Sequence, residues 1–163
     1  MTKMGDLLVR LYDLPVFVSE AKVIASGVTL RRALPPERHL ITDWIGKHFS
    51  RYWISEVETA MSQLPVTCWI ATRGNQLLGF ACHDATAKGF FGPTGVDEAA
   101  RGQGIGESLL IATLRGMREA GYGYAVIGDP GPVEFYQRRL DAMVIPGSTP
   151  GIYKGMLRPP AAE

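Results

Sequence analysis

The residues best suited to chemistry lie in one glycine-rich segment, Arg101-Gly102-Gln103-Gly104-Ile105-Gly106. The segment follows an expected strand and begins the most regular helical pattern of the chain. Glycines let the backbone turn tightly and expose successive N–H groups, and such groups at the positive end of a helix dipole bind anions. Arg101 adds a fixed positive charge. A phosphate or diphosphate is therefore the expected ligand, and a simple turn that starts a helix is the alternative.

Two common phosphate-binding motifs do not fit this segment. A Walker A loop requires Gly-Lys-Ser/Thr, whereas the chain has Gly106-Glu107-Ser108, with a carboxylate in place of the lysine. The dinucleotide fingerprint requires a glycine three residues after its second glycine, and Glu107 stands at that position. The sequence thus argues against an ATPase and against a dinucleotide-binding loop.

The elements that must position this segment are helices and strands in alternation. Apolar residues spaced by three and four predict helices over 36–49, 53–64, 104–120 and 133–140. Short apolar or alternating runs predict strands over 28–33, 66–72, 76–83, 90–96, 124–127, 142–145 and 152–157. This order indicates one mixed α/β layer structure.

The clearest local feature is a hairpin whose turn contains Gly74-Asn75. Centring the turn there predicts Trp69 opposite Phe80, Cys68 opposite Ala81 and Cys82 opposite Thr67. The two cysteines would then point to opposite faces of the sheet, so we expect no disulfide.

The composition of the chain excludes several classes of protein and of partner. The 163 residues suit one domain, and the net charge of +1 gives no basic field for nucleic acid. No apolar stretch is long enough for a membrane span or a signal peptide, so we expect a cytoplasmic protein. The two cysteines and three histidines show no zinc-ligand spacing, so no metal is expected.

The segment Arg101–Gly106 resembles the (Gln/Arg)-x-x-Gly-x-(Gly/Ala) acyl-CoA motif of the GNAT N-acetyltransferase superfamily, in particular its bacterial single-domain members. Phe135-Tyr136 resembles the Phe-Tyr pair that these proteins carry on a later helix. The resemblance implies an α/β fold with a central mixed, mostly antiparallel sheet, helices on both faces, and a splayed parallel strand pair that holds acyl-CoA. By element order it covers about residues 28–157, and it implies one domain over 28–163, with 1–27 as an extension that packs on it.

The resemblance also implies acetyl-CoA as co-substrate. Its pyrophosphate would lie on the amides of residues 103–106, and its pantetheine arm would run along Val96 like an added strand. An N–H near Val96 would bind the thioester oxygen. The implied acetyl-CoA-binding residues are Gly95, Val96, Arg101, Gly102, Gln103, Gly104, Ile105, Gly106 and Ser108.

Three residues are candidates for catalysis. The resemblance implies that Tyr136 is the general acid, because a phenol is protonated at pH 7 and can protonate or hydrogen-bond the leaving thiolate. Asp129 and His83, together with the neighbouring Asp84, are candidates for the base. Asp129 is equally suited to cap the following helix, and the reaction can also proceed without a protein base.

The function implied is transfer of an acetyl group from acetyl-CoA to a primary amine of a small molecule, such as an amino sugar, amino acid, polyamine or drug. A protein or peptide amine is the alternative acceptor, and a noncatalytic acyl-CoA-binding domain is the alternative function. We expect no nucleic acid or membrane partner, and a homodimer by analogy with the family.

Overall fold

A computed structural model of the chain describes residues 5–161. The helices are α1 (Ser19–Ala25), α2 (Arg38–His48), α3 (Arg51–Met61), α4 (Ile105–Glu119) and α5 (Val133–Leu140). The strands are β1 (Leu7–Arg10), β2 (Val28–Arg32), β3 (Cys68–Arg73), β4 (Gln76–His83), β5 (Phe90–Val96), β6 (Tyr124–Ile127) and β7 (Met143–Val144). The fold class is therefore the predicted mixture of helices and strands.

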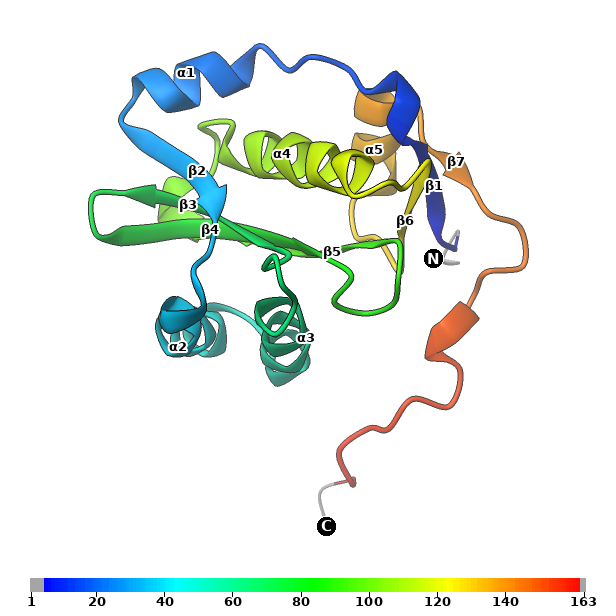
Figure 1. Ribbon diagram of the computed structural model, residues 1–163. Coiled ribbons are helices and arrows are strands. Elements are labelled where there is room, and N and C mark those ends of the chain that lie inside the picture. The colour runs from blue at the N-terminus through cyan, green and yellow to red at the C-terminus, as the bar shows by residue number, and fades with distance from the viewer. Residues whose placement is uncertain (1–4, 162–163) are drawn as a thin grey trace.

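All seven strands form one sheet in the order β2-β3-β4-β5-β6-β1-β7. The pair β5 and β6 is parallel, and every other neighbouring pair is antiparallel. Helices α1, α4 and α5 lie on one side of the sheet, and α2 and α3 lie on the other, as Figure 1 shows. The predicted sheet, with one parallel pair and helices on both faces, is confirmed.

The two faces of the sheet carry separate apolar cores. On the α4 side, Leu109 and Leu114 pack against strand residues such as Ala81. On the α3 side, Val57 packs with Ile70 and Phe80. These helices bury an apolar stripe and expose a polar one, as their spacing of apolar residues predicts.

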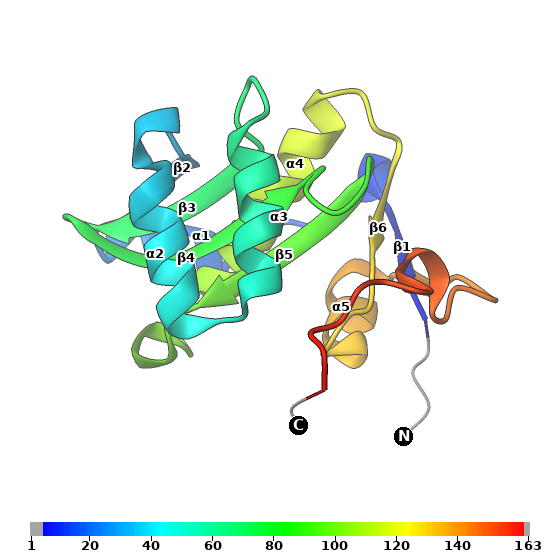
Figure 2. The ribbon, with the colours of Figure 1, turned by 90° about the horizontal axis from the view of Figure 1, so that it is seen from below.

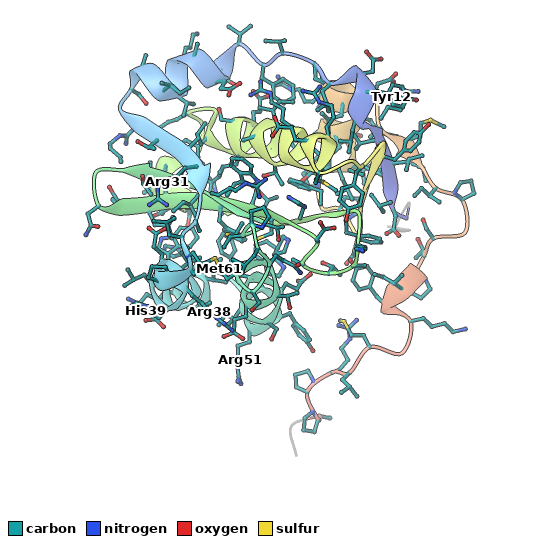
Figure 3. All side chains as sticks on the ribbon, viewed as in Figure 1. Tyr12, Arg31, Arg38, His39, Arg51 and Met61 are labelled. Carbon is teal, nitrogen blue, oxygen red and sulfur yellow. The ribbon has the colours of Figure 1, made fainter. Side chains whose placement is uncertain are left out.

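The outer surface of α2 and α3 is charged. Arg38, His39 and Arg51 are exposed and point away from the sheet (Figure 3). This surface does not contribute to either core.

The predicted register of the hairpin is correct only near its turn. Arg73 pairs with Gln76, as expected, but Leu78 is one extra residue in β4, so Ala71 pairs with Gly79. Beyond this bulge the pairing is shifted by one residue, because the inserted residue has no partner on β3. The pairs Trp69–Phe80 and Cys68–Ala81 were therefore wrong predictions.

The corrected register places Cys68 directly opposite Cys82. Both thiols lie on the α3 side, and both are buried and free. The argument that they point to opposite faces was therefore wrong. Burial, together with the neighbouring Cys68 thiol, raises the pKa of Cys82 well above its ordinary value.

The terminal segments show one strand in addition to the predicted ones and one difference from the prediction. Residues 7–10, which precede the predicted domain start at 28, form β1 between β6 and β7, with Leu7 paired to Ile127 and to Val144. The predicted strand over 152–157 is instead a 3-10 turn, Gly151–Tyr153, followed by extended chain. Gly151 and Gly155 have φ values of +62° and +75°, which do not suit a strand.

Candidate active site

The glycine-rich segment connects β5 to α4, as predicted. Gly102 and Gly104 have φ values of +81° and +86°, which L side chains rarely adopt, so glycine is required at both positions. The first helical hydrogen bond runs from the Ser108 amide to the Gly104 carbonyl, at 3.1 Å. The amides that precede Ser108 in the first turn have no acceptor within the helix and remain available to an anion.

Positive side chains surround the start of α4. Arg101 is exposed and its Nε donates to the Val96 carbonyl, at 3.2 Å. Arg73 of β3 reaches Gln103, with 3.3 Å between Nη2 and Oε1. The carboxylate of Glu107 is neutralised by Arg139 of α5, at 2.6 Å. The carboxylate of Glu107, which is not compatible with a Walker A loop, therefore does not prevent an anion from binding at the start of α4.

Two predicted ligand residues in α4 have buried side chains. Ile105 belongs to the core on the α4 side. The Ser108 hydroxyl donates to the Gly104 carbonyl within the helix, at 2.8 Å. Ile105 can thus contribute only its backbone amide, and the Ser108 hydroxyl is already used.

Strands β5 and β6 run side by side for only two residue pairs, Phe90–Val126 and Phe91–Ile127. Beyond these pairs the strands diverge, as Figure 2 shows. We call this divergence the fork; its sides are residues 92–96 and the chain that follows Ile127. The fork is the splayed parallel pair that the sequence predicted.

The register between β4 and β5 determines which backbone groups face the fork. The Asp97 amide donates to the Leu78 carbonyl at 2.8 Å, so these two residues form a hydrogen-bonded pair. Hydrogen-bonded and non-hydrogen-bonded pairs alternate along the two strands, so the next hydrogen-bonded pair is Phe80 with Gly95. Thr94 and Val96 occupy the other pairs, in which N–H and C=O groups point away from the neighbouring strand. Their N–H groups are therefore directed toward the fork.

A bulge bends β5 at the start of the fork. Ala81 pairs with Thr94 and His83 pairs with Phe91, so Gly92 and Pro93 together oppose the single residue Cys82. Gly92 has a φ of +113° and requires glycine. Further along, the ring of Phe49 covers the α3 side of Gly95, where a Cβ atom would collide with it. Gly95 thus permits close packing as well as lining the fork.

Tyr136 lies beneath the closed end of the fork, on the α4 side. It is only 7% exposed, and its ring packs edge-on against Phe91, with 6.5 Å between ring centroids. Burial raises the pKa of Tyr136 to about 12, because the phenolate would be poorly solvated there. The phenol therefore remains protonated at neutral pH.

Asp129 is the second residue after β6 and lies on the far side of the fork. It has a φ of +45°, and its amide donates to Oδ1 of Asp6, at 3.1 Å. Helix α5 begins after Pro132, which is its N-cap residue and makes no side-chain capping bond. Pro132, not Asp129, thus occupies the N-cap position of α5.

His83 lies in the interior, opposite Phe91. It is 2% exposed, and its Nδ1 lies 3.0 Å from Oδ2 of Asp84. Asp84 also accepts from the Gly89 amide and the Tyr122 hydroxyl. Burial lowers the pKa of His83 despite the nearby carboxylate. Nε2 is buried and has no hydrogen-bond partner within the part of the chain that the structure describes.

Two residues that sequence reasoning missed lie on the α3 side of the fork. Glu56 of α3 accepts a hydrogen bond from the hydroxyl of Thr86. Tyr153 is half-buried, and burial together with the charge of Glu56 raises its pKa to about 12. Glu56 is one of two acidic residues in the amphipathic helix α3, and no spacing distinguishes it from Glu58. The position of Tyr153 depends on the C-terminal chain, which was predicted as a strand.

Within residues 5–161, no group of three or more His, Cys, Asp or Glu side chains could hold a metal ion. The helices of the same residues include none with the length and apolarity that a membrane span requires.

Comparisons with solved structures place the fold. A region of a fungal multi-domain GH3 β-N-acetylglucosaminidase, described as a GCN5-related glucosamine N-acetyltransferase region, matches with a TM-score of 0.71 and 15% identity over 86% of this chain and 19% of that chain. A GCN5-related N-acetyltransferase from Sphaerobacter thermophilus gives 0.66 and 21% over 86% and 48%. A GNAT family acetyltransferase from Brucella melitensis, in complex with acetyl-CoA, gives 0.52 and 22% over 74% and 90%.

The chain spans less than half the length of the first two of these proteins, and at these identities the likeness concerns the fold. A sequence search of the curated proteins finds no match. The model of the acetyltransferase (GNAT) family matches residues 34–141, which include β5, the glycine-rich segment, α4 and α5. The chain therefore belongs to the acetyltransferase (GNAT) family, a family of acyltransferases that use acetyl-CoA.

Proposed function

We propose that this chain transfers the acetyl group of acetyl-CoA to the primary amine of a small molecule. The observation that carries the proposal is the arrangement of two sets of backbone donors. Free amides at the start of α4 suit a pyrophosphate, and the N–H groups of Thr94 and Val96, on the preceding strand, are directed toward the fork.

The chemistry follows from these positions. The pyrophosphate binds the amides of residues 103–106 beside Arg101, and the pantetheine arm extends along Thr94 and Val96. One of their N–H groups donates to the thioester oxygen, which becomes negative when the amine attacks the carbonyl carbon. A preorganised donor of this kind lowers the barrier by about 3 kcal/mol. The C–N bond forms, the C–S bond breaks, and the amine releases its extra proton.

Tyr136 would act on the leaving thiolate. A thiol has a pKa of about 8.5, well below the value of about 12 for Tyr136. Full proton transfer from the phenol is therefore unfavourable, and the phenol stabilises the thiolate by donating a hydrogen bond. The thiolate takes its proton from water after release.

The kind of molecule that accepts the acetyl group is the more specific part of the proposal. A small-molecule amine is favoured because the fungal region with the same fold is described as a glucosamine N-acetyltransferase. A protein or peptide amine and a noncatalytic acyl-CoA-binding domain are the alternatives. The cytoplasmic location, the homodimer and the boundary at residue 28 remain predictions from the sequence.

The test is calorimetric titration of the purified protein with acetyl-CoA, CoA and dephospho-CoA, followed by a screen of amines for release of the CoA thiol. We expect saturable micromolar binding that weakens when Arg101 is replaced by alanine, and thiol release with at least one amine. Binding without turnover of any amine would favour the noncatalytic alternative. If the folded protein binds no acetyl-CoA, both the acetyltransferase function and the noncatalytic acyl-CoA-binding function are excluded.

A further inference from the structure

The acceptor amine must lose protons during the transfer. His83, one of the candidate bases, is only 2% exposed and lies opposite Phe91, a residue of the core on the α4 side that also contains Tyr136. A carboxylate that faces the closed end of the fork from the opposite side would be placed to take a proton from the amine. Glu56 of α3 meets this requirement.

One hydrogen bond and two electrostatic effects locate the carboxylate of Glu56. The hydroxyl of Thr86, in the loop between β4 and β5, donates to Oε2 of Glu56. The charge of Glu56 also acts on the thiol of Cys82, the residue that opposes the bulge in β5, and on the phenol of Tyr153. Glu56 therefore lies between the bulge and the C-terminal segment, on the α3 side of the closed end of the fork.

The C-terminal segment encloses this side. Figure 2 shows that it passes in front of the fork, from the end of β6 toward α3. A Cβ atom on Gly128 would lie 2.5 Å from the Tyr153 hydroxyl, so Tyr153 sits directly against the chain that follows β6. The Tyr52 hydroxyl of α3 donates to the Leu157 carbonyl at 3.2 Å and holds the other end of the segment.

We propose that Glu56 is the general base of the acetyl transfer and that the C-terminal segment, through Tyr153, closes the acceptor side over it. This inference rests on the proposed function. The carboxylate takes the proton that an ammonium acceptor must lose before its nitrogen can attack the thioester carbon. As the C–N bond then forms and the C–S bond breaks, the nitrogen loses its second proton to water. The products are the amide, the CoA thiolate and protonated Glu56, which returns its proton to water. Tyr136 and Glu56 thus act on the leaving group and the nucleophile from opposite faces of the sheet.

The test compares Glu56→Gln with Glu58→Gln, a control on the same helix whose carboxylate is 47% exposed and pairs loosely with Arg38 at 4.0 Å. Glutamine can still accept the hydrogen bond from Thr86 but cannot take a proton. The acceptors are glucosamine, which is an ammonium ion at pH 7, hydroxylamine, which is uncharged there, and water. Thermal unfolding and the acetyl-CoA dissociation constant are measured for every variant.

For Glu56→Gln, we expect kcat/KM for glucosamine to fall about 100-fold or more at pH 7, with acetyl-CoA affinity changed less than twofold. The loss should shrink as the pH rises past the pKa of the amine, and it should be smaller for hydroxylamine. Glu56→Asp should retain part of the activity, and Glu58→Gln should match the wild type. If Glu56→Gln proves unstable, Thr86→Val, which leaves the carboxylate unpositioned, should cause a smaller loss with the same pH dependence.

If Glu56→Gln loses the same factor in kcat/KM at every pH, or loses none, Glu56 is not the general base. The same holds if the wild type binds acetyl-CoA but transfers acetyl to none of the three acceptors. Failure of the wild type to bind acetyl-CoA would instead contradict the proposed function itself.

Discussion

The hydroxyl of Tyr153 lies where a side chain at residue 128 would be. A Cβ atom built on Gly128 would be 2.5 Å from that hydroxyl and 2.9 Å from Cε2 of Phe90. The absence of a side chain at residue 128 thus allows the C-terminal segment to lie against the end of β6.

Replacing Gly128 by alanine should displace Tyr153 from the fork. We expect the free energy of unfolding to fall by about 1–3 kcal/mol, the usual range for overpacking. The KM for the acceptor amine should rise several-fold, while the acetyl-CoA dissociation constant stays within twofold. Gly131→Ala is the control, since nothing lies within 4 Å of its added Cβ. Equal KM values for the two variants would show that Tyr153 does not border the acceptor.

Replacing Gly104 by alanine should damage the pyrophosphate site. The residue has a φ of +86°, and an added Cβ would lie 2.8 Å from Cβ of Ser19. The strain of a left-handed non-glycine residue is about 1–3 kcal/mol, and relieving the collision requires α4 to shift from α1. Calorimetry should show acetyl-CoA binding at least tenfold weaker.

Gly102→Ala separates backbone strain from collision. Gly102 has a similar φ of +81°, but nothing lies within 4 Å of its added Cβ. We expect a smaller loss of acetyl-CoA affinity than for Gly104→Ala. If Gly104→Ala binds acetyl-CoA as well as the wild type does, the start of α4 is not the binding site.

Replacing Tyr136 by phenylalanine should slow the reaction without weakening acetyl-CoA binding. A hydrogen bond to a charged group contributes about 1.5–3 kcal/mol, so kcat should fall roughly 10- to 150-fold. The exposed Tyr124, replaced in the same way, is the control. An unchanged kcat in Tyr136→Phe would remove Tyr136 from the mechanism.

Tyr136 should also make the stability of the fold sensitive to alkaline pH. Its pKa is about 12 in the folded chain and 10.0 ordinarily. Below pH 10 the phenol is neutral in both states, so its contribution is fully present. Between pH 10 and 12 the unfolded chain ionises first, and the free energy of unfolding should fall by about 2–3 kcal/mol.

Urea unfolding of the wild type and Tyr136→Phe at a series of pH values measures this fall. The variant should lose distinctly less stability between pH 10 and 12. Tyr153 contributes in the same direction, but less strongly because solvent screens it. Parallel curves for the two proteins would contradict the assignment to Tyr136.

The parts of the fold that the sequence predicted well are those governed by local patterns. Helix α5 has its predicted bounds, Val133–Leu140, and the prediction of 104–120 for α4 differs from Ile105–Glu119 by one residue at each end. The glycine-rich segment was also found, because glycines at positive φ followed by a helix give a local signal.

The parts that were missed depend on contacts distant in the chain. The extra residue Leu78 shifts the hairpin register, and no local preference reveals it. The place of β1 between β6 and β7 depends on pairs such as Leu7–Ile127. Glu56 acquires its surroundings only when Thr86 and the C-terminal segment fold against α3. Periodicity carries no information about such pairings.

The position of β1 has a practical consequence for labelling. The strand nearest the N-terminus flanks β6 on one edge, and the C-terminal segment covers the end of the same strand. A fluorophore, affinity tag or surface linkage attached to β1 or to the C-terminal segment would therefore lie next to the fork. The turn at Gly74 and Asn75 forms the far end of the β3–β4 hairpin in Figure 1, but it adjoins Arg73, which contacts Gln103, so a label there would lie next to the proposed pyrophosphate site instead.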